Sequence, residues 1–184
     1  MTIIGLSGYA GAGKDTAAQL LVDDFGFERF AFGDYVRDAL ALIDPYLSDG
    51  MRLSTFVDIF DWDDAKRVPP HGDEIRRLMQ VTGDAVRRTA GRDLFIDALM
   101  RDAEHYADVV VSDVRFPEEA LAITNRGGAI WRITRTAGRA TNSHLSETAM
   151  DNFPCDVYLL NNSDILDLSM SIGEILGVRQ GQDS

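Results

Sequence analysis

Cysteine and long apolar runs are scarce in this sequence, and each shortage excludes a class of protein. Cys155 is the only cysteine in 184 residues, so an intrachain disulfide and a cysteine-built metal site are both excluded, and we expect a reducing compartment. No stretch approaches the ~20 apolar residues that a membrane span needs. The first predicted strand begins almost at Met1, so we expect no signal peptide and a cytoplasmic protein that does not bind membranes.

Positive charge is also scarce. The formal net charge is −12 at pH 7, which argues against a general nucleic-acid or anionic-membrane surface. Lys14 and Lys66 are the only lysines, so arginine carries nearly all of the positive charge. Because a local cluster of arginines can invert the field inside a cleft, a small phosphorylated ligand is still compatible with this balance.

The most informative motif lies near the N-terminus. Residues 8–14 read Gly-Tyr-Ala-Gly-Ala-Gly-Lys, the spacing G-x-x-x-x-G-K of a phosphate-binding loop. An apolar run precedes the motif and a segment with helical spacing follows it, which is the strand–loop–helix context that the motif requires. The glycines allow backbone N–H groups to point at phosphate oxygens, and Lys14 is expected to reach the β- and γ-phosphates. The residues predicted to bind the phosphates are Gly11, Ala12, Gly13, Lys14, Asp15 and Thr16.

Asp15 occupies the position where a serine or threonine usually supplies a hydroxyl to magnesium. Either Asp15 contacts the metal, directly or through water, or Thr16 takes over with shifted geometry. Alternatively, Asp15 serves only the first turn of the helix, where a carboxylate suits the helix dipole. The sequence leaves these alternatives open.

Apolar patterning predicts strands and helices in alternation. The predicted strands cover 2–7, 28–32, 108–112, 129–134 and 156–160, and the predicted helices cover 14–25, 34–43, 73–88, 93–106, 117–125, 146–150 and 164–176. Residues 44–72 contain three prolines and are expected to form an irregular, mobile insertion. Five strands with helical crossovers predict one three-layer α/β domain with a five-stranded parallel sheet, which binds ligands at the carboxyl ends of its strands.

Charged side chains follow two of the predicted strands at that edge. Arg37 lies one turn into a helix that begins at an Asp34 cap; it could clamp an acceptor phosphate, or it could be a solvated arginine that balances Asp34 and Asp38. Asp113 ends an apolar strand at the position typical of a magnesium-binding aspartate. Arg115 would face the same cleft, although a helix cap followed by a surface arginine would give the same pattern.

The predicted helix at 73–88 combines an apolar stripe with polar residues off that stripe. The stripe of Leu78, Val81 and Ala85 is typical of core packing. Gln80 could hydrogen-bond a nucleobase edge and Arg88 could reach a phosphate, or both could belong to a solvated face.

Arginines also flank the loop that follows the strand at 129–134. Arg132, Arg135 and Arg139 surround a small-polar segment that could close over a phosphoryl group and exclude water. His144 has no metal-ligand partner at suitable spacing, so we expect it to make a structural hydrogen bond. Asn161 follows the last strand and could read the edge of adenine, or could simply turn the chain.

Together these segments resemble the bacteriophage deoxynucleoside monophosphate kinases, within the wider group of nucleoside and dephospho-CoA kinases that share the P-loop fold. The resemblance is carried by Gly-Ala-Gly-Lys-Asp-Thr at 11–16, Phe-Gly-Asp-x-x-Arg at 32–37, Gln-x-x-Gly-x-x-x-x-Arg at 80–88, Ser-Asp-Val-Arg-Phe-Pro-x-Glu-Ala at 112–120 and His-x-Ser-Glu at 144–147. That family carries an aspartate at the position of Asp15. Two features depart from its pattern: Phe95 stands where members often have tryptophan, and residues 44–72 match no part of it.

The resemblance implies a P-loop kinase fold in a single domain, 1–184, with a helical acceptor-binding region at about 34–106 and a lid at about 135–147. It implies ATP as donor, Mg²⁺ as bridging ion and a deoxynucleoside monophosphate (dNMP) as acceptor. It also implies the host cytoplasm if the protein is phage-encoded, and leaves a homodimer as an open expectation. The implied roles are catalytic for Lys14, Arg115 and Arg132; ATP-binding for Arg135 and Asn161 in addition to the loop; acceptor-binding for Asp34, Arg37, Gln80, Arg88 and Arg115; and metal-binding for Asp15 and Asp113.

The expected reaction needs no general base, because the acceptor phosphate is already an anion near neutral pH. Catalysis would consist of alignment and charge neutralisation. One alternative is a dephospho-CoA kinase or other small-molecule kinase on the same scaffold. An alternative of another class is a non-catalytic module that senses nucleotides.

Overall fold

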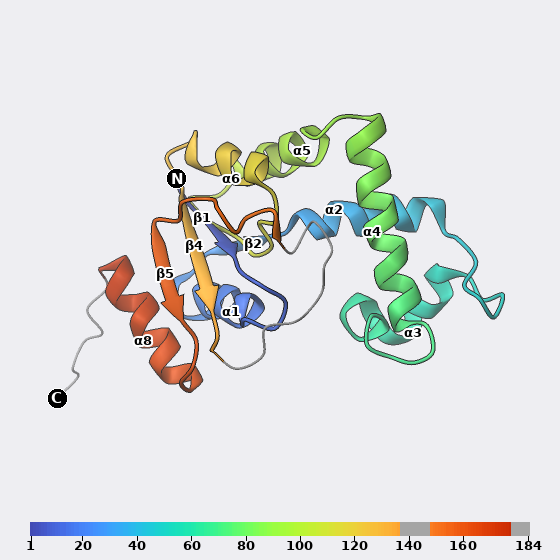
Figure 1. Ribbon diagram of the computed structural model, residues 1–184, viewed down its shortest axis with the longest axis horizontal. Coiled ribbons are helices and arrows are strands. Elements are labelled where there is room, and N and C mark those ends of the chain that lie inside the picture. The colour runs from blue at the N-terminus through green and yellow to red at the C-terminus, as the bar shows by residue number, and fades with distance from the viewer. Residues whose placement is uncertain (137–147, 178–184) are drawn as a thin grey trace. The chain divides into compact units, whose positions relative to one another are not determined.

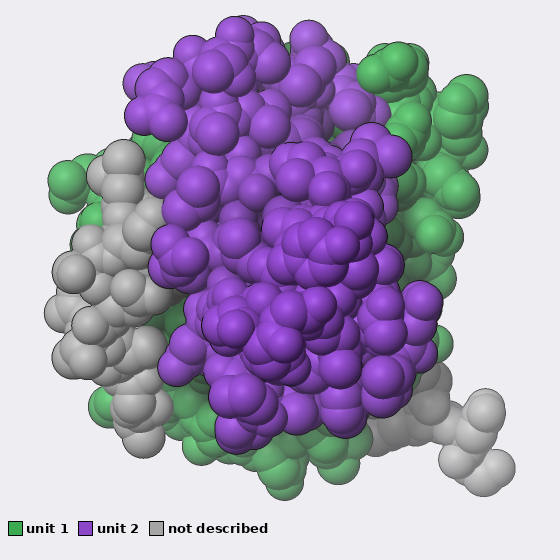
Figure 2. Space-filling view, turned by 90° about the vertical axis from the view of Figure 1, so that its right-hand side faces the viewer, with its two compact units in different colours: residues 1–31, 99–184 green, residues 32–98 purple. Residues whose placement is uncertain are grey.

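The computed structural model of the chain describes residues 1–136 and 148–177. The chain forms two compact units, which Figure 2 shows in different colours. Unit 1 comprises residues 1–31 and 99–184, and unit 2 comprises residues 32–98. The region from 34 to 106, for which we predicted mainly helices, therefore spans nearly all of unit 2.

Unit 1 contains a five-stranded parallel sheet, as predicted. Its strands are β1 (Thr2–Ser7), β2 (Glu28–Phe30), β3 (Asp108–Val111), β4 (Ala129–Thr134) and β5 (Val157–Leu160). They are arranged in the order β2-β3-β1-β4-β5, with β1 at the centre (Figure 1). Strands β1 and β3 are almost continuously apolar and buried, which is the pattern expected of parallel strands covered on both faces.

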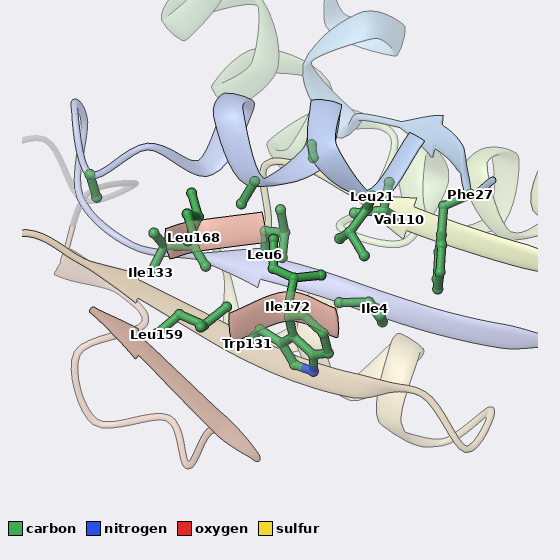
Figure 3. Close-up of a cluster of buried hydrophobic side chains, with 13 residues drawn as sticks. Ile4, Leu6, Leu21, Phe27, Val110, Trp131, Ile133, Leu159, Leu168 and Ile172 are labelled. Carbon is green, nitrogen blue, oxygen red and sulfur yellow. The ribbon is translucent and has the colours of Figure 1, made fainter. Parts of the chain in front are cut away.

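Three helices of unit 1 lie on the two faces of this sheet: α1 (Lys14–Phe25), α6 (Pro117–Thr124) and α8 (Ile165–Leu176). Helices α1 and α8 cover one face, where Leu6, Leu21 and Ile172 are fully buried in a single core (Figure 3). Helix α6 packs against β1 and β4 on the other face. A Cβ atom at Gly5 would lie less than 3.0 Å from side chains of this layer, so glycine allows α6 to approach the central strand. The result is the predicted three-layer α/β architecture.

Unit 2 is helical and has its own core. Its helices are α2 (Phe32–Ile43), α3 (Leu53–Ala65), α4 (Gly72–Thr89) and the first part of α5 (Leu94–Ala103), which continues into unit 1. Leu40 of α2, Leu53 and Phe56 of α3, and Ile75 of α4 are buried together. Helix α2 packs against α4, where Gly83 leaves space for Val36. The amphipathic pattern at 73–88 correctly predicted α4.

The prediction of an irregular insertion at 44–72 was wrong, because α3 lies within it. Two features hid this helix in the sequence. Its buried side is narrow, and four aspartates interrupt the apolar pattern between 58 and 64. The backbone also breaks at Asp61, which has φ 53° and ψ 173°. The Oδ1 atom of Asp61 accepts hydrogen bonds from the N–H groups of Asp63 (2.8 Å) and Asp64 (3.1 Å), so the helix restarts from a cap and does not keep one continuous period.

Two smaller boundaries also differ from the predictions. Helix α2 begins at Phe32, so Asp34 lies within its first turn and is not its cap. Phe32 is buried and is the first residue of this helix. Strand β2 therefore ends at Phe30 and not at the predicted residue 32. Within the described residues, no helix is both long and apolar enough to cross a membrane. The predicted helix at 146–150 falls partly outside the described residues.

Candidate active site

The loop between β1 and α1 has the backbone conformation that the glycine spacing predicted. Gly8, Gly11 and Gly13 have φ angles of 144°, 78° and 100°, which other residues rarely adopt. At two of these glycines, a neighbouring atom also leaves no space for a side chain. A Cβ atom at Gly8 would lie 2.3 Å from the carbonyl oxygen of Ile133, and a Cβ atom at Gly13 would lie 2.1 Å from Nδ2 of Asn161.

Lys14 lies at the start of α1, and its ammonium folds back over the loop. The Nζ atom donates hydrogen bonds to the carbonyl oxygens of Gly8 (2.6 Å) and Tyr9 (3.0 Å). The positive charge is therefore held beside the N-terminal end of α1, which also carries the positive end of the helix dipole. This combination favours a bound polyphosphate.

Asn161 braces the loop from the end of β5. Its Nδ2 donates to the carbonyl oxygen of Ala12 at 3.0 Å, and its backbone N–H donates to Thr134 at 2.7 Å. The sequence suggested base recognition or a simple turn and did not suggest this contact. The next residue, Asn162, accepts a hydrogen bond from the N–H group of Thr136 at 2.8 Å, so the two amides together tie the end of β5 to the loop and to the end of β4.

A pocket lies beside the loop at the carboxyl ends of β1, β3 and β4, the edge where we expected a ligand. Its lining residues are Ser7, Gly8, Tyr9, Val114, Arg115, Arg132, Ile133, Thr134, Met150 and Asp151. The carboxylate of the buried Glu119 accepts hydrogen bonds from the N–H groups of Arg115 (2.8 Å) and Phe116 (3.0 Å). This cap fixes the backbone that presents Arg115 to the pocket, a role of Glu119 that the motif did not predict.

Arg132 also lines the pocket, but its guanidinium is engaged by backbone carbonyls. It donates to the carbonyl oxygens of Met150 and Asp151, the latter at 3.2 Å. Tyr9 fastens the same segment to the loop through a 2.6 Å hydrogen bond from its hydroxyl to Oδ1 of Asp151. Sequence reasoning missed Tyr9 and Asp151, because neither residue belongs to a recognised motif position. These contacts favour a positioning role for Arg132 over direct contact with phosphate.

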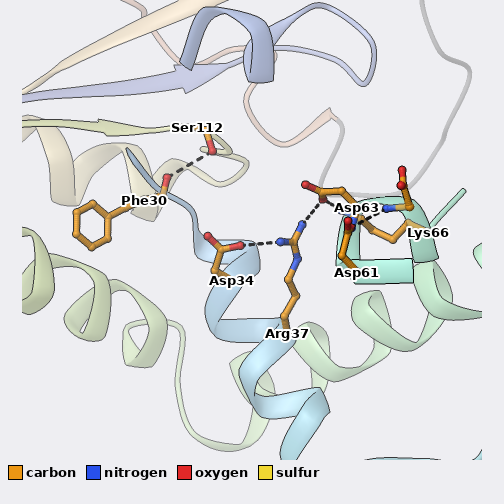
Figure 4. A network of polar contacts seen from close by, with 8 residues as sticks. Phe30, Asp34, Arg37, Asp61, Asp63, Lys66 and Ser112 are labelled. Carbon is orange, nitrogen blue, oxygen red and sulfur yellow. Dashed lines mark hydrogen bonds and ion pairs between the residues drawn. The ribbon is translucent and has the colours of Figure 1, made fainter. Parts of the chain in front are cut away.

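Two of the acceptor-site candidates meet within unit 2. Nη1 of Arg37 lies 3.0 Å from Oδ1 of Asp34, and Nη2 lies 2.8 Å from Oδ1 of Asp63 (Figure 4). The hydrogen bond from Lys66 and the nearby Arg37 charge hold the pKa of the Asp63 carboxyl below its usual value.

The other two candidates in unit 2, Gln80 and Arg88, lie on α4. Gln80 is half-buried and Arg88 is exposed. They are separated by about 12 Å along the helix axis.

The candidate metal ligands are oxygen donors, as a hard cation requires. Asp15 and Thr16 are exposed at the start of α1, and Asp113 is half-buried after β3. Among the described residues, no group of three or more ligating side chains forms a complete metal cage. Mg²⁺ usually uses one or two carboxylates and takes its other ligands from phosphates and water, so this donor set fits an ion that arrives with a nucleotide.

Part of the predicted lid, 135–147, falls on residues that the structure does not describe. Arg139 and His144 lie outside the described residues. Arg135 is exposed just after β4. The flanks of the segment are described, and they are held by Asn162 on one side and by Arg132 and Tyr9 on the other.

Comparison with known proteins agrees with the chemistry of this site. Residues 70–172 match the sequence profile of the family described as "Deoxynucleotide monophosphate kinase". The chain is 30% identical over 185 residues to a predicted deoxynucleotide monophosphate kinase of Acanthamoeba polyphaga mimivirus, with 90% of this chain and 91% of that protein covered. The resemblance inferred from the motifs is thus confirmed, whereas a bacteriophage origin stays a prediction.

Solved structures give a likeness in fold. TT1252 from Thermus thermophilus is 16% identical, with a TM-score of 0.55 and 98% of each chain covered. Shikimate kinase from Aquifex aeolicus is 15% identical, with a TM-score of 0.49 and 96% of each chain covered. The family profile and the viral relative show that this chain belongs to the deoxynucleotide monophosphate kinase family.

Proposed function

We propose that this protein transfers the γ-phosphoryl group of ATP to a dNMP, giving a dNDP and ADP. The observation that carries the proposal is the loop at 8–14, whose glycines have left-handed φ angles and whose lysine folds over the loop, in a member of this kinase family. The family makes the chain a nucleotide-binding P-loop kinase with a small-molecule substrate.

The donor would bind at the loop. The N–H groups of residues 11–16 would surround the β- and γ-phosphates of ATP, and the ammonium of Lys14 would exchange its two carbonyl partners for phosphate oxygens. Asn161 would act on ATP indirectly, by holding Ala12 and the turn at Gly13 in place. Arg135, exposed after β4, would reach the nucleotide from the other side of the loop.

Asp15 and Asp113 would hold Mg²⁺, directly or through its water ligands. Bound there, Mg²⁺ would neutralise negative charge that develops on the phosphates during transfer. Asp15 lies in the first turn of α1 and Asp113 follows β3, so both side chains belong to segments at the carboxyl edge of the sheet. Thr16 is the alternative ligand from the loop.

The acceptor would bind through guanidinium groups. Arg37, oriented by Asp34, would hold the 5′-phosphate of the dNMP, with Arg88 as a second phosphate contact. Gln80 would read an edge of the base. Arg115, which lines the pocket beside the loop, would stabilise the charge on the transferred group.

An ADP-release assay across the four dNMPs and dephospho-CoA tests this proposal. We expect ADP release that depends on a dNMP and is lost in Lys14→Met. Turnover with dephospho-CoA alone would contradict the acceptor class. Tight ATP binding without any acceptor-dependent ADP would favour a nucleotide-sensing module.

A further inference from the structure

The ion-pair network around Arg37 contains a feature that the proposed function does not explain. Two cations converge on a single oxygen atom: Nη2 of Arg37 and Nζ of Lys66 each lie 2.8 Å from Oδ1 of Asp63 (Figure 4). Lys66 is one of only two lysines in the chain, and the other one is in the phosphate-binding loop. Two cationic donors directed at one anionic oxygen form the arrangement that holds a phosphate oxygen.

The side chains of the two cations are less exposed to solvent than the carboxylate that they share. The side chains of Arg37 and Lys66 are 18% and 25% exposed, whereas that of Asp63 is 65% exposed. Because the Asp63 side chain is mostly exposed, water can hydrate its carboxylate when it rotates away from the two cations. The Arg37 guanidinium would remain in place, because Asp34 holds its other terminal nitrogen, Nη1, at 3.0 Å.

The backbone beneath Asp63 is constrained. Asp61 has the positive φ of 53°, a conformation that costs free energy in a residue other than glycine and that often accompanies functional sites. Its carboxylate caps the N–H groups of Asp63 and Asp64. The kink therefore constrains the backbone at Asp63, and its hydrogen bonds do not involve the Asp63 carboxylate.

Arg37 also has donor capacity that its carboxylate partners do not use. Its Nε is buried and finds no hydrogen-bond acceptor in the described part of the chain. A buried guanidinium donor without a partner is costly. The two aspartates thus leave this arginine incompletely satisfied.

We propose that Arg37 and Lys66 form a two-cation seat for the 5′-phosphate of the acceptor, and that the Asp63 carboxylate occupies this seat until a monophosphate displaces it. The proposal rests on the proposed function and adds two residues to it: Lys66 as a substrate-binding residue, and Asp63 as a built-in competitor of the substrate. A monophosphate carries more negative charge than a carboxylate and presents more oxygens to the two cations, so it can replace Asp63.

Two variants with opposite expected effects test the seat. Asp63→Asn removes the competing charge and keeps the side-chain volume, so the KM for the dNMP should fall several-fold. Lys66→Gln removes one charge-assisted hydrogen bond to the phosphate, so the same KM should rise about tenfold. The KM for ATP should not change in either variant. The matched control is Arg67→Gln on the next residue, because Arg67 is exposed and lies 3.8 Å from Asp64 outside this network.

The opposite signs separate the seat from a merely structural ion pair. If the network only stabilised unit 2, both variants would disturb Arg37 in the same direction, or would lower the Tm and leave the KM for the dNMP unchanged. Either result overturns the proposal. The dNMP used is the best acceptor of wild-type protein among dAMP, dGMP, dCMP and dTMP.

Binding without catalysis distinguishes failure of the seat from failure of the proposed function. Calorimetry with the same four monophosphates, in the absence of ATP, should show Kd values that shift in opposite directions in the two variants. If wild-type protein turns over no dNMP but these shifts occur, the kinase assignment fails and the seat stands. If wild-type protein turns over a dNMP and the shifts are absent, the seat fails and the kinase assignment stands. Absence of monophosphate binding to wild-type protein refutes the seat.

Discussion

Replacing Asn161 with alanine removes the hydrogen bond from its Nδ2 to the carbonyl oxygen of Ala12, which spans 3.0 Å. Ala12 is only 5% exposed, so water cannot easily take the place of the lost donor. A buried carbonyl left without a partner costs about 1–3 kcal/mol. If the loop must hold this conformation to bind phosphates, the whole cost falls on the nucleotide-bound form. The KM for ATP should then rise by roughly 5- to 140-fold, because each 1.4 kcal/mol corresponds to a factor of ten.

Steady-state kinetics with varied ATP measures this change, and the rise in Tm on adding ATP provides a second readout. The KM for the dNMP should change little, because the hydrogen bonds that Asn161 makes within the described residues go to the donor loop and to the end of β4. Ser163→Ala is the matched control, since Ser163 is exposed two residues further along. An unchanged KM for ATP, together with an unchanged thermal shift, would refute the idea that Asn161 braces the loop.

Two further predictions concern polar contacts outside the loop backbone. The buried His71 ring lies between two carboxylates, with Nδ1 3.1 Å from Glu74 and Nε2 3.0 Å from Asp49, and the hydrogen bond with Glu74 raises the pKa of His71 above 6.5. Its stabilising contribution is therefore complete below pH 6.5 and is lost as the pH rises through the raised folded-state pKa, so the Tm difference between wild type and His71→Gln should shrink over that rise. Tyr9→Phe and Asp151→Ala should have non-additive effects on the free energy of unfolding, with a coupling of about 1 kcal/mol from their shared hydrogen bond.

Each of these predictions has a direct check. His105→Gln is the control for the pH series, because His105 is exposed. A Tm difference for His71→Gln that does not vary with pH would contradict the stabilising contacts of protonated His71 with Glu74 and Asp49. A double-mutant cycle measured by urea unfolding gives the Tyr9–Asp151 coupling. Additive effects would show that the 2.6 Å contact does not persist in solution.

Local patterns were sufficient to predict much of the fold. The bounds of β1, α1 and β4 are those predicted, because buried β-branched strands, a glycine-rich loop and the αL glycine at Gly26 mark these elements clearly. The pattern failed for α3, where the strained turn at Asp61 divides one helix into two short pieces. Each piece is too short to establish a helical period.

Contacts between residues far apart in the chain limited the prediction of the site. Asn161 and Ala12 are separated by 149 positions, and Tyr9 and Asp151 by 142. No spacing rule connects such residues. The hydrogen bond from Asn161 to Ala12 and the one from Tyr9 to Asp151 therefore could be found only in the structure. The ion pair between Arg37 and Asp63 requires α3, which lies in the segment predicted to be irregular.

Transfer of labelled phosphate tests the central claim most directly. Purified protein is incubated with Mg²⁺, a dNMP and ATP that carries radioactive phosphorus at the γ position, and the products are separated by chromatography. We predict label in the dNDP with wild-type protein, and a loss of roughly 100- to 1000-fold in Lys14→Met with the fold intact by circular dichroism. Label released only as inorganic phosphate, or a Lys14→Met variant with near-normal kcat, would contradict the account.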